Sequence, residues 1–103
     1  MYEILYRKQT LKSISKLKEA RLDKKVKQLI DIIRDNPYQN PPPYEKLVGE
    51  LSGAYSRRIN NKHRLVYQVI EAEKKVRIIS MWSHYENWIK TLISLEKSRL
   101  FAY

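Results

Sequence analysis

The sequence predicts a single α+β domain in which a twisted antiparallel sheet packs against a helical hairpin, in the order β-α-α-β-β-β. Two observations predict this class. Apolar residues recur every three or four positions in the first third of the chain, whereas apolar and polar residues alternate between residues 54 and 84. The length of 103 residues suits one domain with one modest core.

The beginning of the chain predicts a short strand and then a helix. Residues 2–7 (YEILYR) alternate and are rich in β-forming side chains, which favours a strand. Thr10 is a suitable N-cap for a first helix that reaches about Ala20. The apolar stripe of this helix comprises Leu11, Ile14 and Leu17.

A second helix and a stiff connector follow. Asp23 can cap the helix, which should end near Asn36 because the next residue, a proline, disfavours helical backbone before it. Its apolar stripe comprises Leu22, Val26, Leu29, Ile30 and Ile33. The connector, residues 36–43 (NPYQNPPP), contains three consecutive prolines that favour an extended segment. We expect it to hold the nearby Glu45 in a fixed place.

Three strands in a meander are predicted after the connector. Alternation places Tyr55, Arg57 and Ile59 on one face of the first strand and Arg58 on the other. The segment 60–62 (NNK) is a turn candidate, because asparagine tolerates left-handed backbone. The second strand is expected over 63–70, a charged turn over 71–75 and the third strand over 76–84.

The last segment, 86–103, predicts an amphipathic helix. Its apolar stripe comprises Trp88, Leu92 and Leu95. We therefore divide the chain into a domain over 1–85 and a helical extension over 86–103. Two interpretations of the extension stay open: it packs on its own domain, or it packs on a second copy or a partner.

Charge and composition narrow the class of partner. The formal net charge is +10, which favours polyanions such as nucleic acid, the ribosome, acidic lipid or an acidic protein over a merely solvated basic surface. The chain has no cysteine, which excludes disulfides and thiolate metal sites and suits a reducing cytoplasm. It shows neither a signal-peptide core nor the ~18 apolar residues of a membrane span, so we expect no membrane role.

The residue types after the connector suit cleavage of an RNA phosphodiester by the neighbouring 2′-hydroxyl. His84 is the best proton-transfer candidate, because an imidazole titrates near pH ~6.5. Arg58 and Arg64 offer planar forks for phosphate oxygens. Glu45 offers a base, and Tyr85 offers a face for an unpaired nucleotide base. No acidic cluster suggests a magnesium site, so neither a metal nor another cofactor is predicted.

Each of these signals has a plainer interpretation when taken alone. Arg57 and Arg58 are ordinarily a solvated strand edge, and His63 beside a turn favours a local structural role. Tyr55 and Tyr67 fall on apolar faces and predict core positions. No P-loop, HExxH, GxSxG or zinc-ligand spacing occurs.

In combination, the residues resemble the YoeB/Txe group of RelE-like toxins from bacterial toxin–antitoxin modules. The segment YEKLVGELSGAYSRRINNKHRLVYQV and a later SHY carry the resemblance, which covers about residues 2–85. The family pattern is a Glu six residues before LSG, then LSG-aromatic-SRRI, a short turn, HRLVY and a strand ending in HY. The matching positions are Glu45, 51–53, 55–59, 63–67 and His84-Tyr85.

The resemblance implies the RelE-like microbial RNase fold and an endoribonuclease that cuts mRNA in the A site of the 70S ribosome. It implies Glu45 as general base and His84 as general acid, although the residues alone leave that assignment open. Arg64 would stabilise the transition state with help from Arg58, and Tyr85 would position the scissile nucleotide. No metal would be needed.

The resemblance also implies partners and location. The family's antitoxin is a YefM-like protein whose flexible acidic tail folds over the toxin, which suits a +10 surface. The pair would bind its own promoter DNA through the antitoxin, two toxin copies would pair, and the protein would act in the cytoplasm.

This chain departs from the family pattern at two places that matter for function. The family has a Lys three residues after the Glu, whereas here Val48 stands there and Lys46 follows the Glu directly. We predict that Lys46, Arg57 and Arg58 contact RNA. The family tends to end at His-Tyr, whereas this chain continues for 18 residues, which we expect to pack away from the catalytic cleft.

Two rival functions remain beside the nuclease. The first is an RNA- or ribosome-binding domain that blocks translation by occupancy without cutting. The second is a protein-interaction module whose basic face serves only an acidic partner. Cut RNA distinguishes the nuclease from both.

Overall fold

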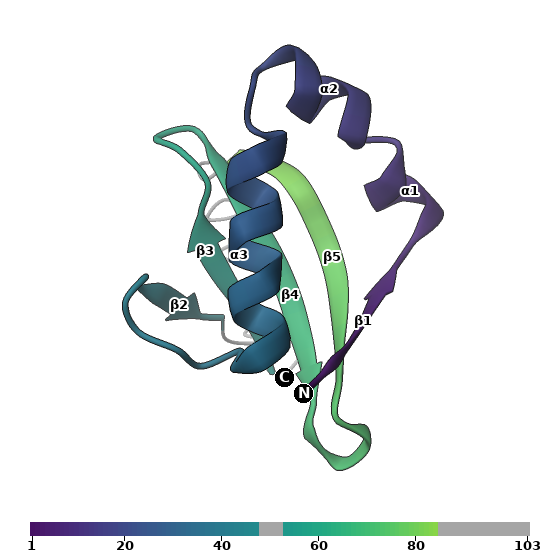
Figure 1. Ribbon diagram of the computed structural model, residues 1–103, viewed down its shortest axis with the longest axis vertical. Coiled ribbons are helices and arrows are strands. Elements are labelled where there is room, and N and C mark those ends of the chain that lie inside the picture. The colour runs from purple at the N-terminus through teal and green to yellow at the C-terminus, as the bar shows by residue number, and fades with distance from the viewer. Residues whose placement is uncertain (48–52, 85–103) are drawn as a thin grey trace, which may run out of the picture.

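The computed structural model describes residues 1–47 and 53–84, the last two by their backbone. They form a five-stranded sheet in the order β1-β5-β4-β3-β2, with helices over one face (Figure 1). The helices are α1 (Lys8–Leu11), α2 (Ile14–Glu19) and α3 (Asp23–Asp35). The strands are β1 (Glu3–Tyr6), β2 (Tyr44–Lys46), β3 (Ala54–Arg58), β4 (His63–Ile70) and β5 (Lys75–His84). A 3-10 turn, Glu71–Glu73, joins β4 to β5.

The predicted α+β class and the sheet packed against helices are confirmed, but the sheet is mixed rather than wholly antiparallel. β1 pairs with β5 in parallel, while β2, β3, β4 and β5 pair antiparallel in turn. A tight turn determines the relative direction of the strands it joins. β1 instead enters the sheet through the helical layer, so its direction depends on where that longer path ends.

Two further elements differ from the predicted order. The first predicted helix is divided into α1 and α2, and Thr10 lies inside α1 rather than before it. Its hydroxyl donates to the Arg7 carbonyl at 2.6 Å and accepts from the Arg7 N–H at 3.0 Å, which closes the first turn. The connector leads into a strand that was not predicted, β2. With three residues, β2 is too short for alternation to be recognised.

The helix α3 supplies most of the cover over the sheet. Four members of its predicted stripe, Val26, Leu29, Ile30 and Ile33, are buried, and the fifth, Leu22, is half-buried. The helix begins at Asp23 itself, with Leu22 in the N-cap position, and ends one residue before Asn36. A carboxylate in the first turn suits the positive end of the helix dipole. No helix in the described residues is long and apolar enough to cross a membrane.

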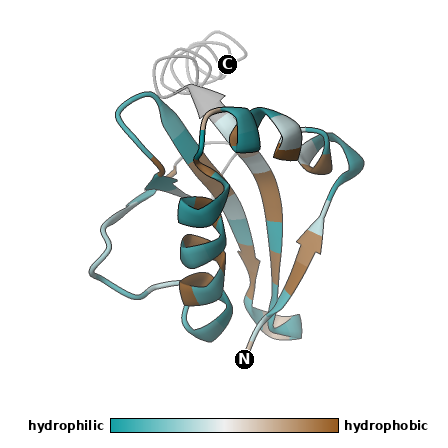
Figure 2. Ribbon diagram, turned by 45° about the horizontal axis from the view of Figure 1, so that its top comes forward, coloured by the Kyte–Doolittle hydropathy of each residue, from teal (hydrophilic) through white to brown (hydrophobic). Residues whose placement is uncertain are grey.

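The core lies between the helices and the covered face of the sheet, where Figure 2 shows hydrophobic strand segments beneath α3. Its fully enclosed members are Leu17, Leu29, Ile33, Leu65, Tyr67, Val76 and Ile78. Among the described residues, the opposite face carries a small apolar cluster, formed by Leu47, Ala54 and Val66 with Ile79 beside them. The rest of that open face around β2, β3 and β4 is therefore available for polar side chains.

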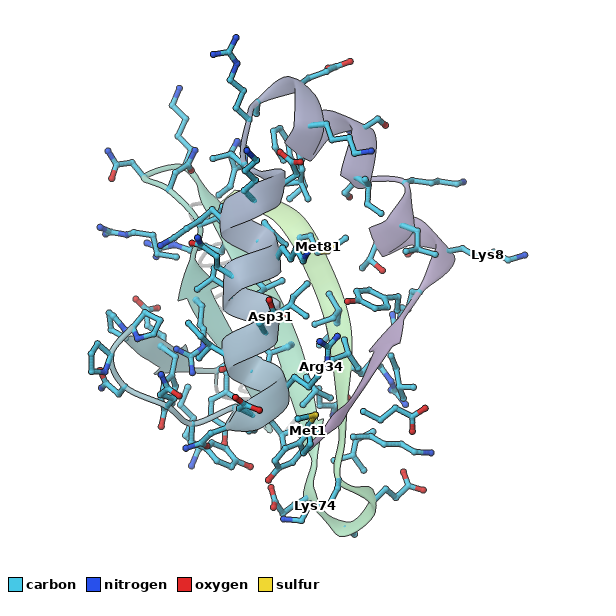
Figure 3. All side chains as sticks on the ribbon, in the orientation of Figure 1. Met1, Lys8, Asp31, Arg34, Lys74 and Met81 are labelled. Atoms are coloured by element: carbon cyan, nitrogen blue, oxygen red, sulfur yellow. The ribbon has the colours of Figure 1, made fainter. Side chains whose placement is uncertain are left out.

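An apolar groove remains on the helical side. Leu11 and Ile14, which were expected to face the core, are 48% and 38% exposed. They line a groove of about 400 Å³ with Tyr6, Met81 and α3. Asp31 and Arg34 on α3, labelled with Met81 in Figure 3, also line it. The division of the first helix leaves α1 and α2 too short to close this groove.

The turn between β4 and β5 is fastened to two distant segments through the Glu71 carboxylate. The Tyr2 hydroxyl donates to Oε1 at 2.7 Å, and the Tyr38 hydroxyl donates to Oε2 at 2.8 Å. Lys74, labelled at this turn in Figure 3, donates to Oε1 at 2.6 Å. These hydrogen bonds, that of Lys74 first, lower the pKa of Glu71 from 4.5 to about 2.

Replacing Glu71 by Gln should lower the thermal unfolding midpoint at pH 7 and leave it unchanged well below pH 2, where the carboxyl is protonated in both states. A carboxyl whose pKa is depressed in the folded state contributes stability that is fully present above its unfolded value of about 4.5 and is lost as pH falls through about 2. Circular dichroism melts across this range measure the effect. Glu73→Gln, in the same exposed turn, is the matched control. Equal midpoints for E71Q and wild type at pH 7 would contradict the prediction.

Candidate active site

A hollow of about 240 Å³ lies on the open face of the sheet, at the edge formed by β2 and β3. The residues that line it are Pro43, Tyr44, Glu45, Ser56, Arg58 and Arg64. Three of them, Glu45, Arg58 and Arg64, are predicted site residues, and three different strands supply them. The fold therefore brings the predicted carboxylate and two predicted cations to one place.

Strand register explains why these side chains converge. Glu45 lies opposite Ser56 across the β2–β3 pair, and Arg58 lies opposite Arg64 across the β3–β4 pair. Side chains of directly paired residues share one face of a sheet, and so do residues two apart along a strand. Ser56 and Arg58 thus link the two pairs. By sheet geometry, Glu45 and Arg58 are diagonal neighbours, roughly 7–8 Å apart at their Cα atoms.

The electrostatics of the hollow favour an anion. Like charges directly opposite one another in a sheet repel, and Arg58 and Arg64 are such a pair. Arg64 is only 8% exposed, so its guanidinium is less screened by water than that of exposed Arg58. A phosphate between the two forks would relieve the repulsion and accept charge-assisted hydrogen bonds. Exposed Glu45 stands at the rim of the same hollow, where it can take a proton from a bound group.

Two predicted RNA contacts lie away from the hollow. Arg57 pairs with Tyr44 and Lys46 pairs with Tyr55, so both side chains belong to the face opposite Glu45. Lys46 is exposed there, whereas Arg57 is 0% exposed. The prediction that Arg57 contacts RNA is therefore wrong for this structure, because its guanidinium is enclosed by protein.

The Arg57 guanidinium is instead held by the connector and by Tyr67. Its Nε donates to the Tyr67 hydroxyl at 3.0 Å, and its terminal nitrogens donate to the carbonyls of Pro42, Gln39 and Pro37 at 2.6, 2.9 and 3.0 Å. The Tyr67 hydroxyl donates onward to the Pro37 carbonyl at 2.7 Å. Burial raises the pKa of Tyr67 to about 12 although Arg57 acts to lower it, so the phenol keeps the proton it donates.

The strand end that carries the predicted general acid lies beside the hollow. In the β4–β5 pair, Ser83 is opposite Arg64 and His84 is opposite His63. The backbone of His84 is thus one residue along from the partner of Arg64. Tyr85 and the predicted helix over 86–103 lie outside the described residues.

The other histidine has the structural environment that was expected for it. His63 is buried, and its ring stacks on Trp82 with centroids 3.9 Å apart. The side-chain oxygen of Asn60 accepts hydrogen bonds from the N–H groups of Lys62 and His63, at 2.9 and 2.7 Å. These bonds form the predicted turn, which directs β4 back along β3 toward the hollow.

Sequence reasoning missed three residues that line the hollow. Ser56 is 8% exposed and lies directly opposite Glu45. Its alternation with Arg58 was a usable signal, since both occupy the same strand face. Pro43 and Tyr44 had no such signal, because their position depends on the unpredicted strand β2. In the described part of the chain, no group of three or more His, Cys, Asp or Glu residues could hold a metal ion.

A family model described as the YoeB-like toxin of bacterial type II toxin–antitoxin systems matches residues 8–85. The chain belongs to this family. It is 40% identical over 68 residues to the toxin YoeB of Synechocystis, an alignment that covers 66% of this chain and 77% of that one.

Solved structures of related toxins share the fold. The YoeB/ParE toxin from Agrobacterium tumefaciens is similar with a TM-score of 0.72 at 26% identity, over 81% of this chain and 99% of that one. The toxin in the heterotetrameric YoeB–YefM complex from Staphylococcus aureus is similar with a TM-score of 0.68 at 32% identity, over 82% of this chain and 99% of that one. The five-stranded sheet with its helical cover is thus the fold of YoeB and RelE toxins.

Proposed function

We propose that this YoeB-like toxin is a ribosome-dependent endoribonuclease that cleaves mRNA in the A site and thereby blocks translation. The observation that carries the proposal is the hollow lined by one carboxylate, Glu45, and by two arginines, Arg58 and Arg64, that lie opposite one another on β3 and β4. Membership of the YoeB-like toxin family supports the same activity, because cleavage of mRNA would explain how the protein acts as a toxin. A substrate on the ribosome would place the activity in the cytoplasm.

In the proposed reaction, the Glu45 carboxylate removes the proton of the 2′-hydroxyl, and that oxygen attacks the adjacent phosphorus. The bond from phosphorus to the 5′-oxygen breaks, and the His84 imidazolium donates a proton to the departing oxygen. The products are a 2′,3′-cyclic phosphate and a free 5′-hydroxyl. Atoms and charge balance without a further reactant.

The two arginines would stabilise the negative charge that develops on the phosphate in the transition state. As the phosphorus becomes five-coordinate, its non-bridging oxygens gain negative charge, which Arg64 and Arg58 can meet with planar forks. A preorganised donor aimed at such charge lowers a barrier by ~3 kcal/mol. Partly enclosed Arg64 is the better placed of the two, because its field is less screened. Tyr85 and exposed Lys46 are proposed to hold the neighbouring RNA.

An acidic antitoxin is the proposed protein partner. The solved Staphylococcus aureus structures contain a YoeB–YefM complex and a YoeB dimer. The +10 charge of this chain suits a YefM-like antitoxin with an acidic tail, which would cover the same cations that RNA needs. Binding to promoter DNA is proposed only for the toxin–antitoxin complex, and pairing of two toxin copies is proposed by analogy with the solved dimer.

Primer extension on a translated mRNA tests the nuclease. Wild-type protein should produce cuts only when ribosomes are present, and His84→Ala should remove them while the protein still sediments with ribosomes. Lys8→Ala is the control, because Lys8 points into solvent on the helical side (Figure 3). Intact RNA with stalled translation would refute cleavage and support blocking by occupancy. No association with ribosomes would support a module that serves only an acidic protein.

A further inference from the structure

Arg57 is the most enclosed cation among the described residues, and the reaction proposed above gives it no task. It is 0% exposed, and every acceptor recorded for it is an uncharged oxygen: the carbonyls of Pro37, Gln39 and Pro42 and the hydroxyl of Tyr67. Burying a charge is costly unless it is well hydrogen-bonded. Four hydrogen bonds, out of the five N–H donors of a guanidinium, meet that requirement here.

These contacts join one rigid strand to one irregular segment. Arg57 belongs to β3, and its three carbonyl acceptors all lie in the connector. The guanidinium also lies 5.0 Å from the ring centroid of Tyr44, the first residue of β2 and its direct partner in the sheet. Arg57 therefore fastens both the connector and the beginning of β2 to the body of the sheet.

The strand that is fastened in this way carries Glu45. Within the described sheet, β2 is an edge strand of three residues whose one neighbour is β3. A strand this short has little stability of its own. Pro41, Pro42 and Pro43, just before it, have no N–H to donate, so backbone hydrogen bonds from these positions cannot anchor it. The Arg57 guanidinium anchors the segment instead, by donating hydrogen bonds to its backbone carbonyls.

We propose that Arg57 is a positioning residue that fixes Glu45 at the rim of the hollow by clamping the connector and β2 onto β3. The residue types explain the choice of arginine. A lysine has three donors at one point, whereas the guanidinium spreads five in a plane and can reach four separate oxygens. The catalytic part of this proposal rests on the proposed function, because it assumes that Glu45 takes part in cleavage.

Amide hydrogen exchange together with cleavage kinetics tests the clamp. In Arg57→Gln, the amides of residues 44–47 should exchange at least ~10-fold faster, while those of β4 and β5 change by less than ~2-fold. The kcat for ribosome-dependent cleavage should fall ~10–100-fold with KM within ~3-fold, because a misplaced group lowers the rate more than binding. Arg57→Lys should recover only a small part of the loss.

Two further variants give the test its contrast. Arg34→Gln makes the same chemical change at an exposed arginine of α3, whose ion pair with Asp31 lies at the helix surface. Amide exchange at 44–47 and kcat should therefore stay at wild-type values. Arg58→Gln should lower kcat for cleavage but leave the amide exchange rates at 44–47 unchanged. Arg58 lines the hollow, whereas the connector carbonyls are bound by Arg57. Tyr67→Phe removes the hydroxyl that accepts from Arg57 and donates to the Pro37 carbonyl. The amides of residues 44–47 should therefore exchange faster than in wild type, but by a smaller factor than in R57Q.

Unchanged exchange at 44–47 in R57Q would overturn the proposal, and so would equal acceleration in all strands, which indicates general destabilisation. If R57Q does not fold, Arg57→Lys and Tyr67→Phe decide by the same comparison. If the wild-type protein cuts no RNA, the proposed function fails on its own, and the exchange data still decide whether Arg57 holds β2 in place.

Discussion

Glu45→Gln should lower the kcat for ribosome-dependent cleavage by about 10²–10⁴-fold, the contribution typical of a general base. The amide keeps the size of the carboxylate and its place opposite Ser56, but it cannot accept a proton. Binding to ribosomes should persist, because Arg58 and Arg64 remain in the hollow. Single-turnover cleavage at saturating ribosome concentration measures the rate, and sedimentation measures the binding.

Glu3→Gln is the matched control for this change. Glu3 is an exposed glutamate on β1, the edge strand at the other side of the sheet, so its replacement should leave the rate within ~2-fold of wild type. A kcat for E45Q within ~3-fold of wild type would exclude Glu45 as the base and leave it at most an orienting role. His84 would then be the first group to test as the base.

Ile33→Ala should have the largest effect on stability, lowering the free energy of unfolding by ~2–5 kcal/mol. Ile33 lies on α3 and is 0% exposed, because its side chain packs into the core between α3 and the sheet. Its truncation removes buried carbon atoms and leaves a cavity. A domain of this size has only ~5–15 kcal/mol of total stability. The change therefore costs a large share of it. Urea unfolding at pH 7 measures the difference.

Ile14→Ala makes the same chemical change in another helix, where the side chain is 38% exposed. Both changes replace isoleucine by alanine, the better helix former, so the difference between them chiefly reports burial. We expect Ile14→Ala to cost less than ~1 kcal/mol. Equal losses at the two positions would show that the Leu11–Ile14 side of the groove is covered in solution.

Local patterns predicted the parts of the fold that depend on neighbours in sequence. The stripe from Val26 to Ile33 predicted α3, and the proline at 37 predicted its end, because helix geometry and backbone sterics act over a few residues. The asparagine turn after β3 and the alternation on both sides of it predicted the β3–β4 hairpin for the same reason. The direction of β1 and the existence of β2 had no local signal.

The candidate site was predictable to the extent that strand alternation reports a shared face. Arg58 and Arg64 share a face because a hairpin with a short turn sets their register. Arg57 was misassigned although alternation had grouped it with Tyr55 and Ile59, which already indicated a covered face. A basic pair on a strand suggests an exposed edge, and nothing near Arg57 in sequence showed which groups would surround its charge.

The sequence by itself determined the fold class, the family and the residue types that a phosphate-binding site needs, because each is contained in short-range periodicity or in a motif. Only the tertiary structure decided which arginine meets the hollow and which one holds the fold. That choice depends on the connector, whose carbonyls lie 15 to 20 residues from Arg57 in sequence and within 3.0 Å of it in space. A buried cation is stable only where such acceptors converge, and their convergence is a property of the folded chain.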